Sequence, residues 1–378
     1  MKLKFLKSLF LTAVPLILAS CKGGGTVTVL EDADSINMKY ASLLTLQEGD
    51  GFIWAQIKNP WDTTRVLHSY VLVPKGQDVP DNLPQGEVIR TPLSKSLFYT
   101  SVHVSLIDEL GAYDAIGGVC DQQYMHIDRI RKDIESGKIV DCGMSQTPDM
   151  ERIMDLAPDA ILLSPFENSG TYGKLGSMGI PIIECADYME TGALARAEWM
   201  RFYGLLVDKR ETADSLFAAT EDDYNALKDL VKDVKRKPTV VCGKKFGASW
   251  HIAGANSTIG QLVADAGGDY VFSDEPATGS VPYAPEKVFD KAQSADLWLF
   301  KYRQEVPLTY DQLAQEWNNY AEMDAFKKRN VYGCNLFYAD YYEETPFHPH
   351  LLLRDYIKVF HPDALKDYQA RYFAKLEE

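Results

Sequence analysis

The chain has 378 residues, more than one hydrophobic core usually organises, so we expect two domains. Apolar residues make up 46% and charged residues 25% of it, which excludes an extensively disordered chain. The formal net charge of −15 excludes nucleic acid as a partner, because phosphates are bound by basic surfaces.

The N-terminal residues have the order of an export signal. Lysines at positions 2, 4 and 7 precede a mostly apolar run over 8–19, which is shorter than the roughly 20 residues of a membrane-spanning helix. The run ends in Leu-Ala-Ser-Cys at 18–21, which resembles the lipobox of bacterial lipoproteins. We therefore predict a signal peptide over 1–20, lipid attachment to Cys21 and a glycine-rich flexible tether over 21–30. An ordinary secretory signal is the alternative.

The remaining cysteines do not predict a metal site. They are Cys120, Cys142, Cys185, Cys242 and Cys334, and no C-x-x-C pair occurs among them. This spacing excludes a zinc site of the cysteine-rich type. A disulfide between Cys120 and Cys142 is one interpretation in an exported protein, and small buried free thiols are the interpretation we favour.

Residues 51–90 contain three β-type runs, at 52–57, 66–73 and 87–90, separated by turn residues. From residue 97 onward the pattern changes to an alternation of helices and strands, which predicts an α/β fold with parallel sheets. The predicted helices are 102–110, 150–156, 171–178, 194–206, 210–235, 257–266 and 287–292, and the predicted strands are 115–119, 160–163, 180–183, 239–242 and 297–300. The helix over 210–235 would be about 39 Å long, enough to span a domain.

A weak internal repeat relates the two halves of this α/β region. Residues 148–163 and 285–299 both begin with Pro, then carry Glu, a basic residue, a β-branched residue and Asp, and end in a strand. The repeat predicts two similar lobes, each presenting a helix whose first turn carries Pro and Glu. Chance similarity between amphipathic helices is the alternative.

Three segments carry a family resemblance. Residues 106–119 match an opening helix, a Leu-Gly turn and a strand, residues 151–161 a Glu-basic-Ile…Leu-x-Pro-Asp-x-Ile segment, and residues 178–183 a Leu-Gly-Ile-Pro-Val strand. In this order they resemble the substrate-binding lipoproteins of ABC importers for metal chelates, the family of the vitamin B12, haem and ferric-siderophore binding proteins. The resemblance covers residues 95–300.

The resemblance implies two Rossmann-like α/β lobes, with parallel or mixed sheets flanked by helices and bridged by one long helix. This is the class III periplasmic-binding-protein architecture, here with an extra N-terminal β segment. We accordingly divide the body into a first lobe with the β extension (31–192), a helical linker (193–237) and a second lobe (238–378), with the ligand in the cleft between the lobes.

The resemblance also implies a partner, an ABC permease dimer with its ATPase. In the family a surface Glu on each lobe docks into arginine pockets of the permease, and the matching positions here are Glu151 and Glu286. A carboxylate in the first turn of a helix is stabilised in its ionised form and can accept a bidentate Arg pair. The alternative is that each Glu only stabilises its own helix.

Ligands of α/β lobes meet the loops that follow the carboxyl ends of parallel strands. The candidate ligand-binding residues in these loops are Tyr124, Phe166, Trp250, Tyr283, Tyr302 and Arg303. Aromatic rings suit flat chelates, and Arg303 or Lys301 suits an anionic group. His126 and His251 are candidate axial metal ligands, and the pair His348 and His350 is a weaker metal signal. For each histidine an ordinary hydrogen-bonded role is the alternative.

We therefore expect an extracytoplasmic binding lipoprotein of an ABC importer, anchored through Cys21 on the periplasmic side of a bacterial membrane. It would capture an iron chelate (ferric siderophore or haem) or cobalamin, with no resident cofactor. A binder of free zinc or manganese is the alternative, although none of the seven histidines pairs at helical ligand spacing. An enzyme is not expected, because no nucleophile elbow, P-loop or dinucleotide fingerprint occurs. The chelate, the membrane that receives the lipid and the role of residues 26–90 stay open.

Overall fold

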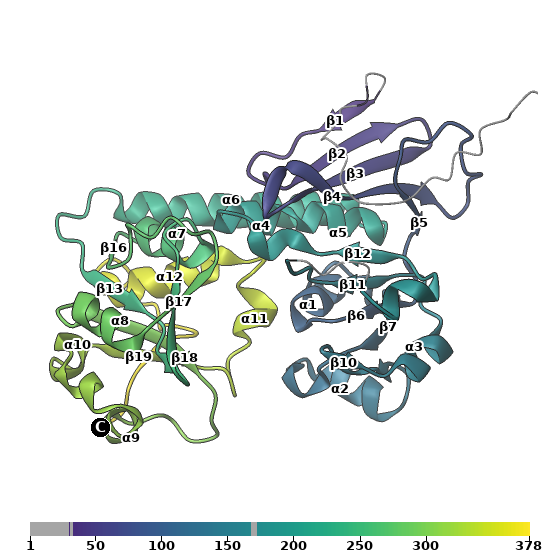
Figure 1. Ribbon diagram of the computed structural model, residues 1–378. Helices are drawn as coiled ribbons and strands as arrows, with labels where there is room; N and C mark the ends of the chain where they lie inside the picture. Colours follow the sequence, from purple (N-terminus) through teal and green to yellow (C-terminus); the bar gives the residue numbers. More distant parts are fainter. Residues whose placement is uncertain (1–29, 31–32, 168–171) are drawn as a thin grey trace, which may run out of the picture.

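The computed structural model describes residue 30 and residues 33–167 and 172–378. Figure 1 shows two α/β lobes beneath the long helix α6 (Arg210–Val231), with a separate β-sheet above the first lobe. The predicted signal peptide, Cys21 and most of the predicted tether lie outside the described residues. Within the described ranges, no helix combines the length and the apolar character needed to cross a membrane.

The first lobe is built on a parallel sheet with the strand order β12-β11-β6-β7-β8. Its strands are β6 (Ser96–Phe98), β7 (Ile116–Val119), β8 (Val140–Asp141), β11 (Ile161–Leu163) and β12 (Ile182–Glu184). The intervening elements are α1 (Ser101–Glu109), α2 (Asp128–Glu135), α3 (Met150–Leu156) and the short antiparallel pair β9 (Gly143–Met144) and β10 (Thr147–Pro148). Strands β6 and β11 are buried along their whole length, as expected for parallel strands covered on both faces.

The second lobe repeats this plan with a mixed sheet in the order β16-β13-β18-β19-β20, in which only β20 is antiparallel to its neighbour. The strands are β13 (Thr239–Cys242), β16 (Asp269–Tyr270), β18 (Leu297–Tyr302), β19 (Val331–Asn335) and β20 (Ala374–Lys375). A second, antiparallel sheet contains β14 (Lys245–Phe246), β15 (Ser249–Ala253) and β17 (Ser280–Tyr283). The helices are α7 (Thr258–Asp265), α8 (Pro285–Ala292), α9 (Tyr310–Glu316), α10 (Asp324–Lys327), α11 (Tyr341–Glu344) and α12 (Pro349–Phe360). The predicted α/β class with parallel or mixed sheets is confirmed.

Helix α6 connects the two hydrophobic cores through one stripe of side chains. Its buried residues are Ala213, Phe217, Thr220, Tyr224, Leu227 and Val231, which recur every three or four positions and so lie on one face. Phe217 belongs to the core of the first lobe, whereas Tyr224 and Leu227 belong to the core of the second. The helix ends at Val231, four residues before the predicted end at 235, and is about 33 Å long at 1.5 Å per residue.

Two other predicted helices need correction. The helix expected over 194–206 is divided into α4 (Ala193–Glu198) and α5 (Met200–Leu206), which meet at the fully buried Trp199. Of the helix expected over 171–178, the described part contains only a 3-10 segment, Leu175–Met178. Tyr172 and Gly173 have φ values of 56° and 57°, which an α-helix does not accommodate.

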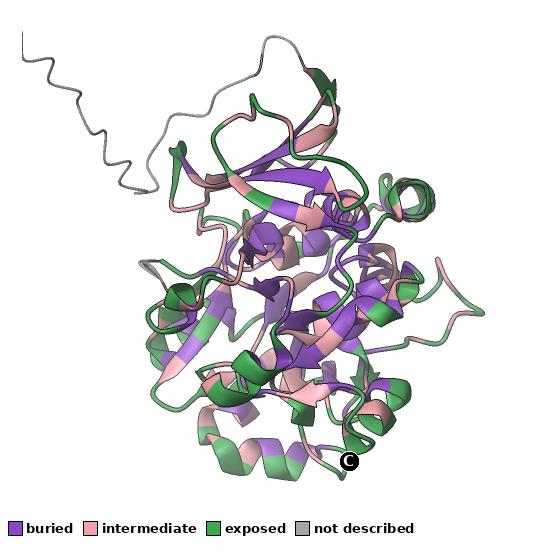
Figure 2. Ribbon diagram, turned by 90° about the vertical axis from the view of Figure 1, so that its right-hand side faces the viewer, coloured by how far each residue is buried: buried purple, intermediate pink, exposed green. Residues whose placement is uncertain are grey.

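The N-terminal sheet has the order β1-β2-β3-β4-β5, with β1 (Asp34–Ile36), β2 (Leu44–Gly49), β3 (Phe52–Asn59), β4 (Asp62–Pro74) and β5 (Glu87–Thr91). Neighbouring strands are antiparallel except β4 and β5. One face carries Leu46, Ala55 and Tyr70, which belong to the core of the first lobe. In Figure 2 buried residues accordingly continue from this sheet into the lobe below it. The extension is therefore part of the packed body.

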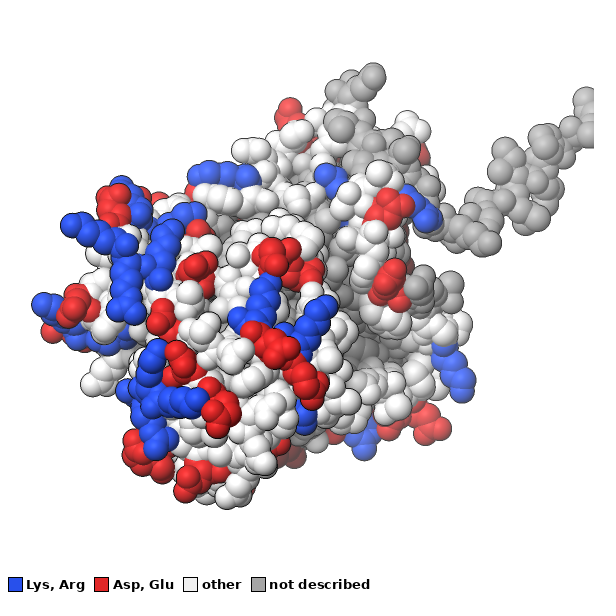
Figure 3. All heavy atoms as spheres, turned by 60° about the vertical axis from the view of Figure 1, so that its left-hand side comes forward, with Lys and Arg blue, Asp and Glu red and all other residues white. Residues whose placement is uncertain are grey.

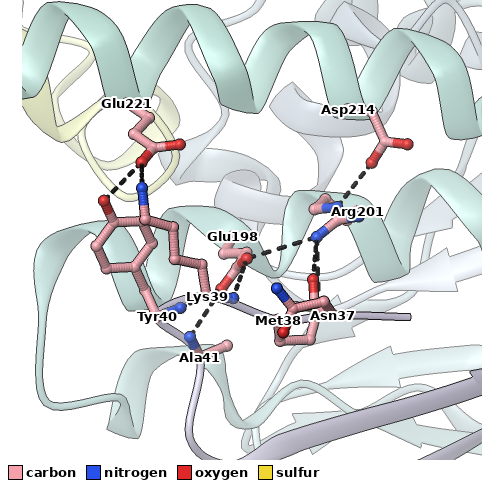
Figure 4. A network of polar contacts seen from close by, with 9 residues as sticks. All are labelled: Asn37, Met38, Lys39, Tyr40, Ala41, Glu198, Arg201, Asp214 and Glu221. Atoms are coloured by element: carbon pink, nitrogen blue, oxygen red, sulfur yellow. Dashed lines mark hydrogen bonds and ion pairs between the residues drawn. The ribbon is translucent and has the colours of Figure 1, made fainter. Parts of the chain in front are cut away.

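The chain segment before β2 is fastened to the helices by buried carboxylates (Figure 4). Glu198, with 0% of its surface exposed, accepts the backbone N–H groups of Lys39, Tyr40 and Ala41 at 2.7, 2.7 and 2.8 Å. Arg201 donates to the carbonyl of Asn37 at 2.7 Å. These contacts join the extension to α4 and α5, and Lys39 and Tyr40 also bind Glu221 on α6, so this network fixes the sheet on the helical connection.

A second buried carboxylate lies at the helix break. Glu190, also 0% exposed, accepts the backbone N–H of Leu43 at 2.9 Å and the indole N–H of Trp199 at 2.9 Å. The Trp199 ring is held toward the β extension at the point where α4 gives way to α5. This contact joins positions far apart in sequence, so no local pattern predicts it.

Candidate functional site

The loops that follow β7, β18 and β19 meet between the lobes. The loop over 120–127 belongs to the first lobe, and the segments 303–308 and 336–340 belong to the second. All three follow the carboxyl ends of parallel strands, where an α/β lobe binds its ligand. The cleft between the lobes is therefore the candidate site.

Arg303 reaches from the second lobe to the first. Its guanidinium donates to the carbonyl of Leu336 at 2.8 Å on its own lobe. Across the cleft it donates to the carbonyl of Gln123 at 3.3 Å and lies 3.4 Å from Nε2 of His126. The structure thus brings together Arg303 and the loop that carries Tyr124 and His126, as the strand-end argument predicts.

Aromatic rings flank this guanidinium from both lobes. The ring of Tyr124 lies 5.5 Å from it and the ring of Phe337 lies 5.6 Å from it. Tyr124 is 50% exposed and the neighbouring Tyr338 is 65% exposed. A cation between exposed rings can hold a flat or aryl-bearing anion by stacking and charge together.

Lys301 supplies a second cation two residues earlier on β18. Its ammonium lies 4.6 Å from the ring centre of Tyr341 and 4.8 Å from that of Tyr342. In the part of the chain that the structure describes, neither Lys301 nor Arg303 has a carboxylate within ion-pair distance. Two cations without a counter-charge favour an anionic ligand.

The outer face of the second lobe differs in this respect. Figure 3 shows acidic and basic side chains interspersed over it. Lys327 pairs with Glu322 at 2.8 Å and Lys328 with Asp324 at 2.9 Å. Because these charges neutralise one another locally, this face provides no field of a single sign.

A histidine and two carboxylates also meet at the cleft. Nδ1 of His126 lies 3.3 Å from a carboxylate oxygen of Asp340, and Glu343 completes a group whose potential ligand atoms all lie within 4.8 Å of one another. Asp340 is exposed, whereas Glu343 is buried on α11 and bonds the side chain of Ser101 on α1. Burial raises the pKa of Glu343, and the nearby His126 and Ser101 oppose that shift.

The prediction that Trp250 contacts the ligand is contradicted by its burial. Trp250 is 0% exposed and packs against Trp298 and Tyr320, with ring centroids 5.9 and 5.6 Å away. Side chains alternate along β15, so Trp250 points into the core and the next residue, His251, points to solvent. Trp250 therefore belongs to the core of the second lobe.

Tyr283 and Tyr302 have internal partners. The hydroxyl of Tyr283 donates to Glu275 at 2.5 Å, and the hydroxyl of Tyr302 accepts the backbone N–H of Leu308 at 3.2 Å. Both rings are half-buried, and a Cβ on Gly333 would meet the ring of Tyr302 at 2.6 Å. These contacts are structural, so a role of Tyr283 and Tyr302 at the ligand stays a prediction.

In the described part of the chain, Arg303 makes no contact with the other predicted residues Phe166, His251 and His348. Phe166 is 60% exposed beside Tyr172, with ring centroids 6.4 Å apart. Nε2 of His348 lies 2.7 Å from a carboxylate oxygen of Glu109, an ordinary ion-pair or hydrogen-bond partner. Among the described residues, neither His348 nor His251 belongs to a group of potential metal ligands.

The cysteine alternatives are resolved by the geometry. Cys120, Cys142, Cys185, Cys242 and Cys334 are all buried and free. Burial raises the pKa of the Cys142 thiol to about 11, with Asp141 adding to the rise. The favoured interpretation, buried free thiols, is confirmed, and the disulfide between Cys120 and Cys142 is not formed.

Glu151 and Glu286 occupy matching positions in the two lobes. Each is exposed in the first turn of its helix, α3 or α8, and each helix leads toward a parallel strand, β11 or β18. Asp149 caps α3 by accepting the N–H groups of Glu151 and Arg152, both at 3.1 Å. The structural repeat therefore places one carboxylate on each lobe.

One side of the cleft was not predicted from the sequence. It contains Phe337, Tyr338, Asp340 and Glu343, which all follow β19, beyond the last predicted element. The signal that could have found them is the density of aromatic and acidic residues over 337–344, immediately after a short buried strand.

A hollow of about 720 Å³ lies elsewhere on the first lobe. Its lining includes Lys95 and Ile116, at the amino ends of β6 and β7, together with Lys138 and Arg152. We place the candidate site in the cleft instead, because the carboxyl-end loops of both lobes meet there.

Comparisons with known proteins agree on the kind of protein that this chain is similar to. The family model described as periplasmic binding protein matches residues 99–335. An uncharacterized lipoprotein of Methanocaldococcus jannaschii is 25% identical over 302 residues, which cover 76% of this chain and 70% of that protein.

Two solved structures illustrate the shared fold. The apo haem-binding periplasmic protein RhuT from Roseiflexus sp. RS-1 has 19% identity and a TM-score of 0.55, with 72% of this chain and 99% of that chain covered. A protein of an ABC-type Fe³⁺-hydroxamate transport system from Saccharomonospora viridis has 16% identity and a TM-score of 0.56, with 71% and 94% covered. At these identities the likeness shows the fold alone.

Proposed function

Because the chain belongs to the periplasmic binding protein family, we propose that it is the substrate-binding lipoprotein of an ABC importer for a metal chelate. The ligand is an iron chelate, either a ferric siderophore or haem, or else cobalamin, and it is bound between the lobes and delivered to the permease. The observation that carries this proposal is the position of Arg303, which contacts both lobes at the carboxyl ends of their strands.

The chemistry of the cleft supports an anionic ligand with flat groups. Arg303 and Lys301 offer positive charge that no described carboxylate neutralises, and Tyr124 and Phe337 offer exposed ring faces. Ferric catecholates, some ferric hydroxamates and haem propionates carry negative charge next to planar groups. The haem-binding and Fe³⁺-hydroxamate proteins that share the fold agree with this class.

The same proposal includes the anchor and the partner. Lipid attachment at Cys21 would hold the body at the outer surface of a membrane, where it meets an ABC permease dimer with its ATPase. Glu151 and Glu286 would each pair with arginines of the permease, since both are exposed carboxylates at helix N-termini.

Titration of the full-length protein in detergent tests the ligand class. Haemin, a ferric hydroxamate, a ferric catecholate and cyanocobalamin are added separately while heat is measured by isothermal titration calorimetry. Saturable binding of one class at micromolar or lower concentration supports the proposal. Absence of binding by all four, with binding of Zn²⁺ or Mn²⁺ instead, contradicts it.

Charge reversal tests the partner. The double variant E151K/E286K is expected to bind its chelate as the wild type does and to lose uptake in cells that depend on this importer. The matched control is E135K, because Glu135 is an exposed carboxylate at the other end of a helix, α2. Normal uptake by the double variant would contradict docking through these residues.

A second candidate function, capture of free zinc or manganese, is favoured by one observation. His126, Asp340 and Glu343 place an imidazole and two carboxylates within 4.8 Å of one another. Such nitrogen and oxygen donors suit both ions.

A further inference from the structure

We infer that the N-terminal sheet, β1 to β5, faces the membrane that holds the lipid on Cys21, and that the permease lies in the opposite membrane. This arrangement rests on the anchor and the docking residues of the proposed function. It changes that proposal in one respect, because the lipid and the permease are then held by two different membranes. It also gives the N-terminal sheet a function, which the sequence alone does not show.

Leu30 is fixed to the N-terminal sheet. Its backbone N–H donates to the side-chain oxygen of Gln47 at 3.0 Å, and its carbonyl accepts from the side-chain nitrogen of Gln47 at 3.2 Å. Gln47 is 1% exposed, so water competes little for these two hydrogen bonds. The Leu30 side chain packs against the buried cluster of Trp54, Val71 and Val73. The chain that comes from the predicted lipid is therefore held at residue 30.

The face of the sheet that carries Gln47 is turned away from the first lobe. Gln47 lies opposite Trp54 in the register of β2 and β3, whereas the neighbouring pair, Leu46 and Ala55, belongs to the core of the first lobe. Because side chains alternate along a strand, Gln47 and Trp54 point to the other side of the sheet. The chain therefore enters the body on the outer face of the N-terminal sheet.

The proposed docking residues lie at the other end of the molecule. Glu151 and Glu286 are in the first turns of α3 and α8, which lie in the lower half of the molecule in Figure 1, whereas the N-terminal sheet lies at its top. Each of these helices leads into the amino end of a parallel strand, β11 or β18, so its first turn lies toward the carboxyl ends of the strands. The docking carboxylates thus share a side with the loops of the cleft, and the entering chain does not.

The chain between Cys21 and Leu30 is too short to span the body. Leu30 is the ninth residue after Cys21, and nine residues reach at most about 32 Å. A compact chain of roughly 350 residues has a radius of gyration of about 20 Å, which corresponds to a diameter of about 50 Å. With the docking end on the membrane that holds the lipid, Leu30 would lie about 50 Å above that membrane, beyond the reach of Cys21. The docking end therefore points away from the lipid.

The N-terminal sheet passes this orientation on to the lobes. Its inner face belongs to the core of the first lobe, and the buried Glu198 and Glu190 bind the segment before β2 to the helical connection. The lobes therefore cannot turn independently of the sheet. With the sheet toward the lipid, the cleft and both docking carboxylates face the opposite membrane, where the arginines of a permease can pair with them.

Energy transfer to labelled lipids tests the orientation. The full-length lipidated protein is bound to phosphatidylcholine vesicles that contain a lipid with an acceptor dye on its headgroup. A donor dye is attached to V88C, on the outer face of the sheet, or to Q146C, in the exposed turn between β9 and β10 at the lower end of Figure 1. The native cysteines of the described chain are buried, so the introduced thiol is the accessible one. Transfer from V88C is expected to be at least about twice that from Q146C, because the body is about 50 Å across.

A longer tether provides the matched control. Duplicating residues 22–29 extends the reach to about 60 Å, which exceeds the diameter of the body, so the difference between V88C and Q146C should shrink. With the native tether, equal transfer from both positions or stronger transfer from Q146C overturns the inference. A protein that does not bind vesicles through Cys21 overturns it as well.

Fractionation of cell membranes tests the position of the permease. In cells that depend on this importer, the protein is expected in the membrane fraction that lacks the importer's ATPase. Uptake by a protein that is recovered only with the ATPase contradicts the arrangement, even when a chelate binds normally. If the orientation and the separate membranes are found but no chelate binds, the proposed chelate function fails while the arrangement stands.

Discussion

Two interfaces between parts of this molecule are built differently, and we call them joints. The first joins the N-terminal sheet to the helical connection, and the second joins the two lobes across the cleft. Where the N-terminal sheet meets the helical connection, Glu198 and Glu190 are fully buried and accept N–H groups at 2.7–3.0 Å. On the side of the cleft that carries Arg303, Arg303 and His126 make contacts of 3.3–3.4 Å, and Arg303 and Asp340 are exposed. Short, buried contacts resist separation, whereas longer contacts between exposed groups open at little cost. The first joint is therefore the permanent one, whereas the contacts around Arg303 can open to admit a ligand.

The largest expected effect is at the permanent joint. E198A removes the acceptor of three backbone N–H groups and leaves that of the buried Ala41 without its partner, so the free energy of unfolding should fall by about 2–4 kcal/mol. Urea denaturation followed by circular dichroism measures the loss. E135A, at an exposed carboxylate of α2, should change stability by less than about 0.5 kcal/mol. Equal stability of the two variants would mean that the N-terminal sheet is only loosely attached.

A second contrast compares two predicted ligand residues. W250A empties a core position and should cost about 3–5 kcal/mol of stability. Y124A truncates a half-exposed ring at the cleft and should change stability by less than about 0.5 kcal/mol while weakening chelate binding about tenfold. Thermal melting and calorimetric titration of both variants check this. A Y124A protein with wild-type affinity would remove Tyr124 from the site.

The smallest expected effect is the pH dependence of the stability that His68 contributes at the edge of the permanent joint. Burial lowers the pKa of His68, but hydrogen bonds to Glu184 and Glu87 outweigh burial and raise it to about 9. This lies above the value of an unfolded histidine, about 6.5, so the stabilisation is complete below that pH and is lost as pH rises through about 9. The stability difference between wild type and H68Q should shrink from pH 6 to pH 10. A difference that does not change with pH would show that these contacts carry no charge.

The same contrast between local and distant contacts explains what the sequence could predict. The helix of α3, the strands β11 and β13 and the first residue of α6 follow from hydrophobic periodicity and turn residues close in sequence. The break between α4 and α5 lies at Trp199, whose indole binds Glu190, which in turn binds Leu43. No periodicity within the helix encodes such a contact.

At the candidate site, too, the residues that a local sequence signal marks were predictable and the others were not. Tyr124, His126 and Arg303 were predictable because each follows a recognisable parallel strand. Asp340 and Glu343 were missed because the short strand β19 and the four-residue helix α11 give little sequence signal. Trp250 was misassigned because the alternation of β15 decides which of two neighbouring side chains is buried.

Calorimetric titration of R303M against the chelate class that the wild type binds tests the central claim most directly. R236M is the matched control, because Arg236 is an arginine with 84% of its side chain exposed and lies away from the carboxyl ends of the strands. We expect R303M to bind at least about tenfold more weakly, a loss of about 1.4 kcal/mol, and R236M to bind as the wild type does. Equal affinity of R303M, R236M and the wild type would contradict the assignment of the ligand to the cleft at Arg303.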